Sequence, residues 1–248
     1  MSVTVPSTPP NDRLDPSNES APQATRRQWV SRLLSRAVSL WLKAQVESLD
    51  ELHVEIAARD RQIFGGVLPW ISLKASGVVY RGVHLSAVEM HATNIRVNLS
   101  EIVRGKPLQL LEPVHAEARI LWQALDLHAS VHSPLLAEAL DELFAPALGA
   151  IAPDGTRAAL SYSQLSLEAG QLCLSGSRDG DRFTLKTYLD AGDRRFLRFG
   201  SPSLTWEGQD TAIALAPFTV DLGEQVRLDH VEIAPEAIAC GGHLEITA

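Results

Sequence analysis

The sequence predicts an α+β fold in which antiparallel strands dominate. Residues 77–114 alternate apolar and polar side chains, as a half-buried strand requires. Residues 25–46 instead repeat apolar side chains with the period of an amphipathic helix. Residues 158–248 show strand patterns throughout. We therefore expect a curved sheet with a small number of helices packed against it.

The central stretch, residues 77–114, predicts a strand hairpin, a one-turn helix and a third strand. The phase of its alternation slips around Val88 to His91, which is typical of a β-bulge or a sharp bend. Ser100 is the expected N-cap of the short helix, and Gly105 the expected residue after its end. The expected apolar face comprises Val83, Leu85, Ala87, His91, Thr93, Ile95, Val97 and Leu99, and the polar face His84, Ser86, Glu89, Asn94, Arg96 and Asn98.

Charge is distributed unevenly along the chain. The 248 residues carry a net charge of −8, which argues against a nucleic-acid-binding protein, because a polyanion requires a basic surface. Between Arg26 and Val46, however, there are five basic residues and no acidic one. A cationic segment is thus attached to an acidic body.

Length, cysteine content and hydropathy limit the class of protein. The chain is long enough for one large or two small domains. Cys173 and Cys240 make no disulfide framework; they could pair, but two isolated cysteines are more often buried free thiols. We recognise neither a membrane-spanning apolar run nor a secretory signal, so we expect the protein to stay in the compartment where it was made.

The N-terminal region combines a polar tail with a helix. Residues 1–24 are rich in Pro, Ser, Thr and Asn, which predicts disorder, and Thr25 is a possible N-cap for the helix that follows. Two interpretations of this helix stay open: a core helix with a solvated basic back, or an amphipathic helix lying on an anionic membrane. The lack of acidic residues favours the second. The candidate lipid- or membrane-binding residues are Arg26, Arg27, Trp29, Arg32, Leu33, Arg36, Trp41 and Lys43.

A strand and a loop are expected between this helix and the central stretch. Residues 52–57 alternate and predict a strand, and residues 71–75 predict another. Leu68-Pro69-Trp70 predict a loop with an exposed apolar tip. Trp70 could insert into a membrane, although such a residue more often folds back on the core; it completes the set of candidate binding residues.

Beyond the central stretch we expect one strand at 116–121 and helices at 124–131 and 133–148. Ser133 as N-cap and Pro134 in the first helical position mark the start of the second helix. A turn at 152–156 is the expected boundary, within a single domain, between a helix-containing half (25–152) and an all-β half (157–248). The strands expected in the second half are 160–167, 171–175, 182–189, 195–199, 203–206, 212–215, 218–222, 226–233 and 243–247. Among the turns expected between them are Ser201-Pro202 and Gly241-Gly242.

The sequence contains no recognisable catalytic motif: no G-x-S-x-G elbow, phosphate-binding loop, H-E-x-x-H or C-x-x-C. His128 and His132 have metal-ligand spacing and Asp126 is nearby, but no third ligand is suggested, and histidines at helix ends commonly act as caps. We therefore expect no metal, no cofactor and no enzymatic activity. A curved sheet with an apolar face, closed by a helix, is a way to make a groove for an acyl chain.

Six short runs of residues together resemble the pattern of a known protein family. They are Val79-Tyr80-Arg81-Gly82-Val83, Asn94-Ile95-Arg96-Val97, Gly105-Lys106-Pro107-Leu108, Glu112-Pro113-Val114, Asp126-Leu127-His128 and Ser133-Pro134-Leu135-Leu136. Together with residues 45–66, they resemble the LmeA-like phospholipid-binding family, formerly a bacterial domain family of unknown function. The resemblance extends over residues 30–242.

The resemblance implies an elongated β-groove with a long N-terminal amphipathic helix packed along it, similar to tubular lipid-binding domains. It also implies phospholipid binding at a bacterial membrane without chemistry on the lipid. Two features depart from the family. No signal peptide is recognised, which favours an internal membrane face, and His128 stands where the family more often has Asn. No family residue carries over as a lipid ligand.

These observations favour a peripheral lipid-binding or lipid-transfer protein, whose partner is a phospholipid or an anionic membrane surface. The alternative is a scaffold or assembly protein whose apolar groove binds a partner protein. An enzyme acting on lipid or glycan is disfavoured, because no convincing nucleophile or acid/base set is present.

Overall fold

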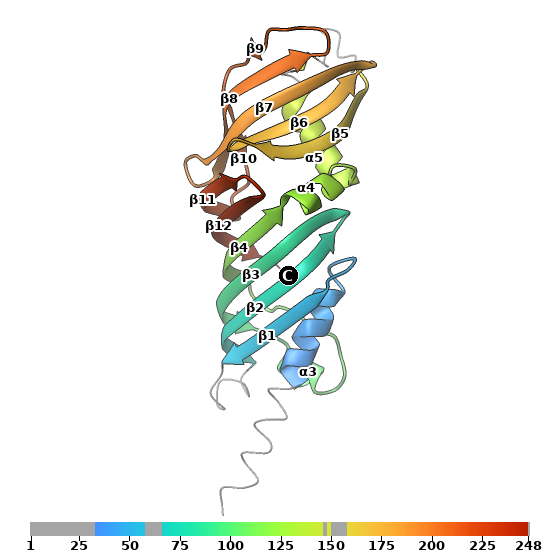
Figure 1. Cartoon of the computed structure of the whole chain (residues 1–248). Helices are drawn as coiled ribbons and strands as arrows, with labels where there is room; N and C mark the ends of the chain where they lie inside the picture. Colours follow the sequence, from blue (N-terminus) through green and yellow to red (C-terminus); the bar gives the residue numbers. More distant parts are fainter. Residues whose placement is uncertain (1–32, 58–65, 146–147, 150–157, 248) are drawn as a thin grey trace, which may run out of the picture.

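The computed structural model describes residues 33–57, 66–145, 148–149 and 158–247. Two open antiparallel sheets follow one another along the long axis of an elongated molecule, and the helices lie on one side of them (Figure 1). The α+β class with predominant antiparallel strands, predicted from the sequence, is confirmed.

The first sheet occupies the lower half of Figure 1 and has the strand order β1-β2-β3-β4-β12-β11. Its centre is the long hairpin of β2 and β3, joined at Arg81 and Gly82, which both have positive φ (49° and 77°). Such a two-residue turn matches the twist of the strands that it connects. The strands are β1 (Glu51–Ala57), β2 (Val67–Tyr80), β3 (Val83–Arg96), β4 (Val114–Gln123), β11 (Val226–Ala234) and β12 (Ala237–Ile246).

The chain returns to the first sheet at its C-terminal end. β12 pairs with β4 from Ala237 opposite Gln123 to Ile246 opposite Val114, and β11 pairs with β12. Strands from both ends of the described chain therefore share one sheet. The turn expected at 152–156 lies outside the described residues, and the division into two halves stays a prediction.

The second sheet has the order β10-β8-β7-β6-β5, with β9 paired to β8. Two turns expected from the sequence lie inside strands instead. Ser201-Pro202 is part of β8, which continues through Ser201 although that residue has a positive φ of 47°. Gly241-Gly242 is part of β12. The strands are β5 (Leu160–Glu168), β6 (Gln171–Arg178), β7 (Asp181–Ala191), β8 (Phe196–Trp206), β9 (Ile213–Ala214) and β10 (Phe218–Asp221).

Four helical segments occur in the described residues: residues 33–43, α3 (Leu99–Ile102), α4 (Ala124–Ser130) and α5 (Pro134–Phe144). The cap predicted for α5 is confirmed, since the Ser133 side chain accepts a hydrogen bond from the Leu136 amide at 3.1 Å. The cap predicted for α3 is wrong. Asn98, not Ser100, precedes that helix, and its side chain instead binds the following loop.

The position along β3 at which the apolar–polar alternation slips also differs from the prediction. The register between β2 and β3 is regular across Val88 to His91. The irregularity lies at Asn94, which adopts a left-handed φ of 54°, so that both Thr93 and Asn94 are exposed before Ile95 is buried. Val83, Leu85, Ala87, His91 and Thr93, predicted on the apolar face, consequently lie on the outer face of the sheet. His84 and Ser86, predicted on the polar face, lie on the inner side, where Ser86 contacts α4.

Two separate hydrophobic cores stabilise the molecule. The first core joins residues 33–43 and the lower end of the first sheet, around Leu34, Leu68 and Ile95. The second core joins α4 and α5 to the second sheet, around Phe144 and Leu185. Part of the first sheet lies between them.

Candidate functional site

The inner face of the first sheet, on the side of the helices, is apolar over its whole width. Its residues form rows across all six strands, each row two residues further along. Going away from α3, the rows are Ile56, Ile71, Ala92, Ala116, Leu244 and Val226; then Val54, Leu73, Met90, Ala118, Gly242 and Leu228; then Leu52, Ala75, Val88, Ile120, Cys240 and Val231.

Nine residues of the second and third rows belong to neither hydrophobic core. We call them the central strip. Several of them are only half-buried, among them Val88, Ile120 and Leu228. An apolar surface of this kind, inside a molecule and between two cores, is suited to hydrocarbon. The central strip comprises Leu52, Leu73, Ala75, Val88, Ala118, Ile120, Leu228, Cys240 and Gly242.

A cavity opens at the lower end of the central strip, beneath the helix of residues 33–43. Its volume is about 90 Å³. Leu73 belongs both to the cavity wall and to the strip, so the two are continuous. Every lining residue is apolar: Val38, Trp41, Leu42, Leu68, Ile71, Leu73, Met90, Ala92, Ile95, Val97, Leu108, Leu110, Val114 and Ile246.

The size of the cavity limits what it can hold in this conformation. An apolar cavity of roughly 150 Å³ is needed for one benzene molecule, and ligand pockets usually measure about 300 Å³ or more. A volume of 90 Å³ therefore accepts only the end of a hydrocarbon chain. A longer chain has to extend along the central strip or displace the helix.

α4 closes the upper end of the inner face through polar contacts. The Ser86 hydroxyl donates to Asp126 Oδ2 at 2.6 Å, and the His84 amide donates to the Ser130 hydroxyl at 2.8 Å. Ser130 is fully buried, and its hydroxyl also donates to the Asp126 carbonyl at 2.7 Å. These contacts fix α4 to β3, whereas the helix of residues 33–43 is held by apolar packing.

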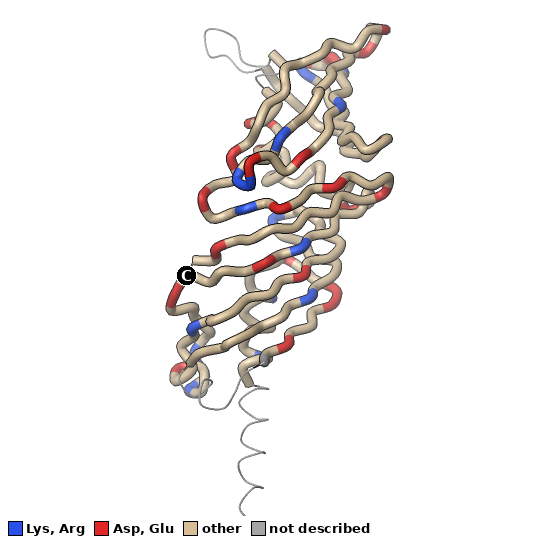
Figure 2. The backbone as a smooth tube through the Cα atoms, turned by 90° about the vertical axis from the view of Figure 1, so that its left-hand side faces the viewer, with Lys and Arg blue, Asp and Glu red and all other residues tan. Residues whose placement is uncertain are grey.

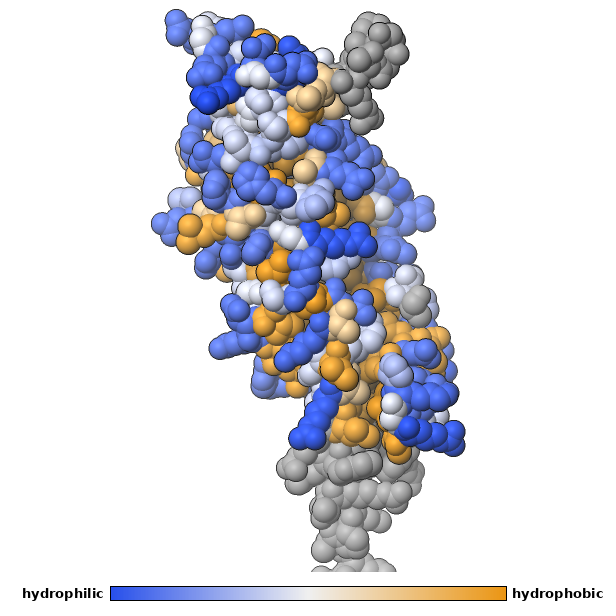
Figure 3. Space-filling model, turned by 90° about the vertical axis from the view of Figure 1, so that its right-hand side faces the viewer, coloured by the Kyte–Doolittle hydropathy of each residue, from blue (hydrophilic) through white to orange (hydrophobic). Residues whose placement is uncertain are grey.

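The outer face of the first sheet has the opposite character. Rows of charged and histidine side chains cross it, and Lys and Arg positions alternate with Asp and Glu positions in Figure 2. Lys74 forms an ion pair with Glu89 at 2.9 Å, and this contact lowers the pKa of Glu89. In the space-filling view of the opposite side, hydrophobic side chains gather over the lower half (Figure 3). Of the two faces, the inner one is therefore the one suited to hydrocarbon.

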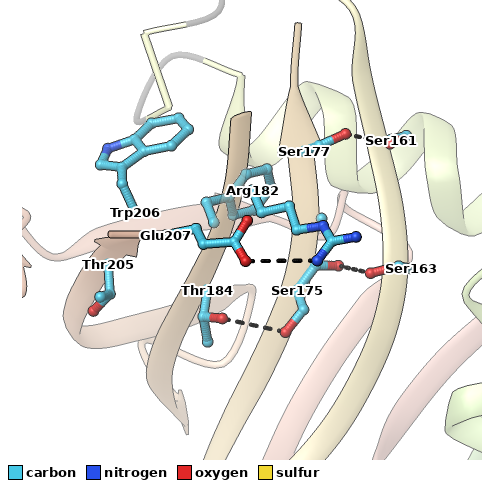
Figure 4. A pocket seen from close by; sticks show the side chains of 11 residues that line it. Ser161, Ser163, Ser175, Ser177, Arg182, Thr184, Thr205, Trp206 and Glu207 are labelled. Carbon is cyan, nitrogen blue, oxygen red and sulfur yellow. Dashed lines mark hydrogen bonds and ion pairs between the residues drawn. The ribbon is translucent and has the colours of Figure 1, made fainter. Parts of the chain in front are cut away.

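A second, larger hollow of about 410 Å³ lies on the second sheet, on the face opposite α5 (Figure 4). Its hydroxyl groups contact one another: Ser161 and Ser177 at 2.9 Å, and Ser175 and Thr184 at 3.3 Å. Arg182 and Glu207 approach to 3.6 Å above them. Hydroxyl and charged side chains make up most of this lining, beside Phe183 and Trp206, whereas the smaller cavity is lined by apolar residues alone. We therefore place the candidate site at the smaller cavity.

The candidate residues predicted from the sequence fall into three groups. Leu33 packs on the first core and Trp41 lines the cavity, while Arg36 and Lys43 are exposed on the other side of the same helix. Trp70 lies within β2, not in a loop, and its ring stacks on His91 at 6.0 Å on the outer face, away from the cavity. Arg26, Arg27, Trp29 and Arg32 lie outside the described residues.

In the part of the chain that the structure describes, His, Cys, Asp and Glu form no group that could hold a metal ion. Both cysteines are free: Cys173 is buried in β6, and Cys240 belongs to the central strip. Burial raises the pKa of both thiols, which disfavours the reactive thiolate. Among the described helices, none has the length and apolar character needed to cross a bilayer.

A comparison of the sequence with known protein families shows to which family the chain belongs. Residues 25–243 match the LmeA-like phospholipid-binding family. The chain belongs to that family. No curated protein and no solved structure matches it. The LmeA-like family is a phospholipid-binding family, not an enzyme family, and an inner face suited to hydrocarbon agrees with that description.

Sequence reasoning missed most residues of this candidate site in the LmeA-like chain. Strand alternation could assign faces to the β2–β3 hairpin, but the partners Ala118, Cys240 and Gly242 come from strands whose pairing no local pattern reveals. β12 was expected only from residue 243 onward. Its glycines were interpreted as a turn, whereas Gly242 lies on the inner face of the sheet.

Proposed function

We propose that the protein binds phospholipid by its acyl chains, along the central strip and in the cavity beneath residues 33–43, without chemistry on the lipid. One observation carries the proposal: the inner face of the first sheet is apolar from β1 to β11 and continues into a wholly apolar cavity. Such a surface takes hydrocarbon, and the charged headgroup remains in water.

The protein works, in this proposal, as a carrier peripherally associated with an anionic membrane on its cytoplasmic side. Residues 33–43 of the amphipathic helix predicted from Thr25 pack on the first sheet, with Arg36 and Lys43 exposed, and the predicted start of that helix lies outside the described residues. Each basic residue near an anionic surface contributes about 1 kcal/mol of attraction. Replacing Arg26, Arg27, Arg32, Arg36 and Lys43 with Gln would then weaken vesicle binding at low salt.

The deciding experiment is mass spectrometry of an organic extract of the purified protein, beside a native spectrum of the intact one. A phospholipid in near-stoichiometric amount in both spectra supports the proposal. An empty protein that also takes up no lipid from vesicles contradicts it. Co-purification of one stoichiometric protein without lipid would instead support a scaffold whose groove binds a partner.

A further inference from the structure

The loop between α3 and β4 presents apolar side chains in two directions. Val103 and Leu111 are 51 % and 59 % exposed, although both are large and apolar. Leu108 and Leu110, from the same loop, line the cavity. One short segment therefore connects solvent at the lower end of the molecule with the wall of the cavity.

The loop is held in a fixed conformation, so the exposure of Val103 and Leu111 does not result from an unanchored chain. The Gln109 amide donates to Asn98 Oδ1 at 2.8 Å, and the Asn98 side chain donates to the Pro107 carbonyl at 3.0 Å. The Leu111 amide donates to the Arg96 carbonyl at 2.9 Å. Asn98 itself is buried, which makes it the internal support of the loop.

Basic side chains surround the two exposed apolar residues. Arg104 and Lys106 belong to the loop, and Arg96 ends the preceding strand. The acidic neighbours are already paired, Glu101 with Lys106 at 2.8 Å and Glu112 with Arg96 at 3.1 Å. Lys106 and the Asn98 amide lower the pKa of Glu101. Within the described ranges no acidic group pairs with Arg104, so this end is cationic on a protein of net charge −8.

The helix of residues 33–43 adds a similar stripe beside the loop. Arg36 and Leu40 lie one turn apart on its exposed side, and Leu40 is 72 % exposed. Figure 1 shows the loop after α3 curving beside this helix, and both elements contribute to the cavity wall.

We propose that this end of the molecule, formed by Val103, Arg104, Lys106 and Leu111 with Arg36 and Leu40, docks on an anionic lipid bilayer. Val103 and Leu111 enter the interfacial region while the basic side chains meet headgroups. An acyl chain then passes between the loop and the helix into the cavity. The proposal rests on the proposed function, since it names the membrane-facing end of the same site.

The test measures flotation of the full chain with vesicles of phosphatidylcholine alone or mixed with phosphatidylglycerol. The double variant Val103→Ser/Leu111→Ser should bind the mixed vesicles about tenfold more weakly, because each lost apolar side chain removes interfacial burial. Arg104→Gln/Lys106→Gln should lower binding to the mixed vesicles only, and added salt should weaken the wild type likewise. Leu125→Ser is the matched control, since Leu125 is 83 % exposed on α4, at the other end of the first sheet.

Loading from detergent micelles separates docking from lipid binding. The Val103→Ser/Leu111→Ser variant should accept phospholipid from micelles as the wild type does, while its uptake from vesicles falls. Unchanged flotation of this variant, or an equal loss in Leu125→Ser, would overturn the docking surface and leave the lipid site standing. Normal docking by a wild type that holds no lipid under either condition would overturn the proposed function instead.

Discussion

Ala118 of β4 lies directly opposite Gly242 of β12, so two of the smallest residues of the inner face meet in the middle of the central strip. Gly242 itself has no freedom to change, because a Cβ atom would lie 2.2 Å from the Arg227 carbonyl oxygen. Ala118 therefore offers the cleaner way to test whether the strip holds lipid.

Ala118→Trp should fill the central strip and weaken phospholipid binding about tenfold, equivalent to about 1.4 kcal/mol. A titration with a fluorescent phospholipid measures the change, and urea unfolding checks for the roughly 1–3 kcal/mol cost of overpacking. Thr93→Trp, on the exposed outer face of β3, is the control. Equal affinities for the two variants would exclude the strip as the binding surface.

The Cys240 thiol should report on occupancy of the strip. Because burial raises its pKa, it stays protonated at neutral pH, and its alkylation should accelerate only as the pH rises past the ordinary thiol value near 9.0. In a Cys173→Ser background, bound phospholipid should slow alkylation at high pH several-fold, as followed by mass spectrometry. A rate independent of lipid would mean that the acyl chain does not cover β12.

Ser130→Ala should detach α4 from β3 in part. The partly buried His84 amide would lose the Ser130 hydroxyl as its acceptor, and an unsatisfied donor away from water costs about 1–3 kcal/mol. Denaturant unfolding measures this loss. Ser161→Ala, which removes an exposed hydroxyl paired with Ser177, should change the unfolding free energy by no more than about 0.5 kcal/mol. A similar loss of unfolding free energy in both variants would show that the contact between Ser130 and β3 stabilises the protein no more than an exposed hydroxyl pair does.

Asn94 should tolerate glycine and reject a β-branched residue. Its φ of 54° lies in the left-handed region, where Asn and Gly are accommodated but other residues lose about 1–2 kcal/mol. Asn94→Gly should therefore unfold at the same denaturant concentration as the wild type, or a higher one, and Asn94→Val at a lower one. The reverse order would place the change of face elsewhere in β3.

Local sequence signals predicted the elements that depend on neighbouring residues. The β2–β3 hairpin and the Ser133-Pro134 helix start follow from turn, cap and alternation patterns that span a few positions. The one-turn helix α3 was also predicted, although its N-cap is Asn98 and not Ser100. The slip in the apolar–polar alternation was predicted around Val88 to His91, several residues before Asn94, where the backbone of β3 is irregular. His91 and Thr93 were therefore assigned to the wrong face of the sheet.

Long-range pairing could not be predicted in the same way. Trp70 looked like a loop tip beside Pro and Gly, yet it is paired in register with Thr93 across the hairpin. Glycines at 241 and 242 looked like a turn because no local feature indicates that β4 and β11 flank them. The candidate site consists mainly of such partners, so alternation revealed its apolar character but not its composition.

The position of β12 between β4 and β11 also has a consequence for biosynthesis. A ribosome makes β1 to β4 first, and these strands display an apolar face and an unpaired edge at β4 until residues 237–246 emerge. Exposed strand edges and apolar faces favour aggregation of incomplete chains. The candidate site is consequently among the last parts of the molecule to mature, and its apolar face stays open in a newly made chain until β12 pairs with β4.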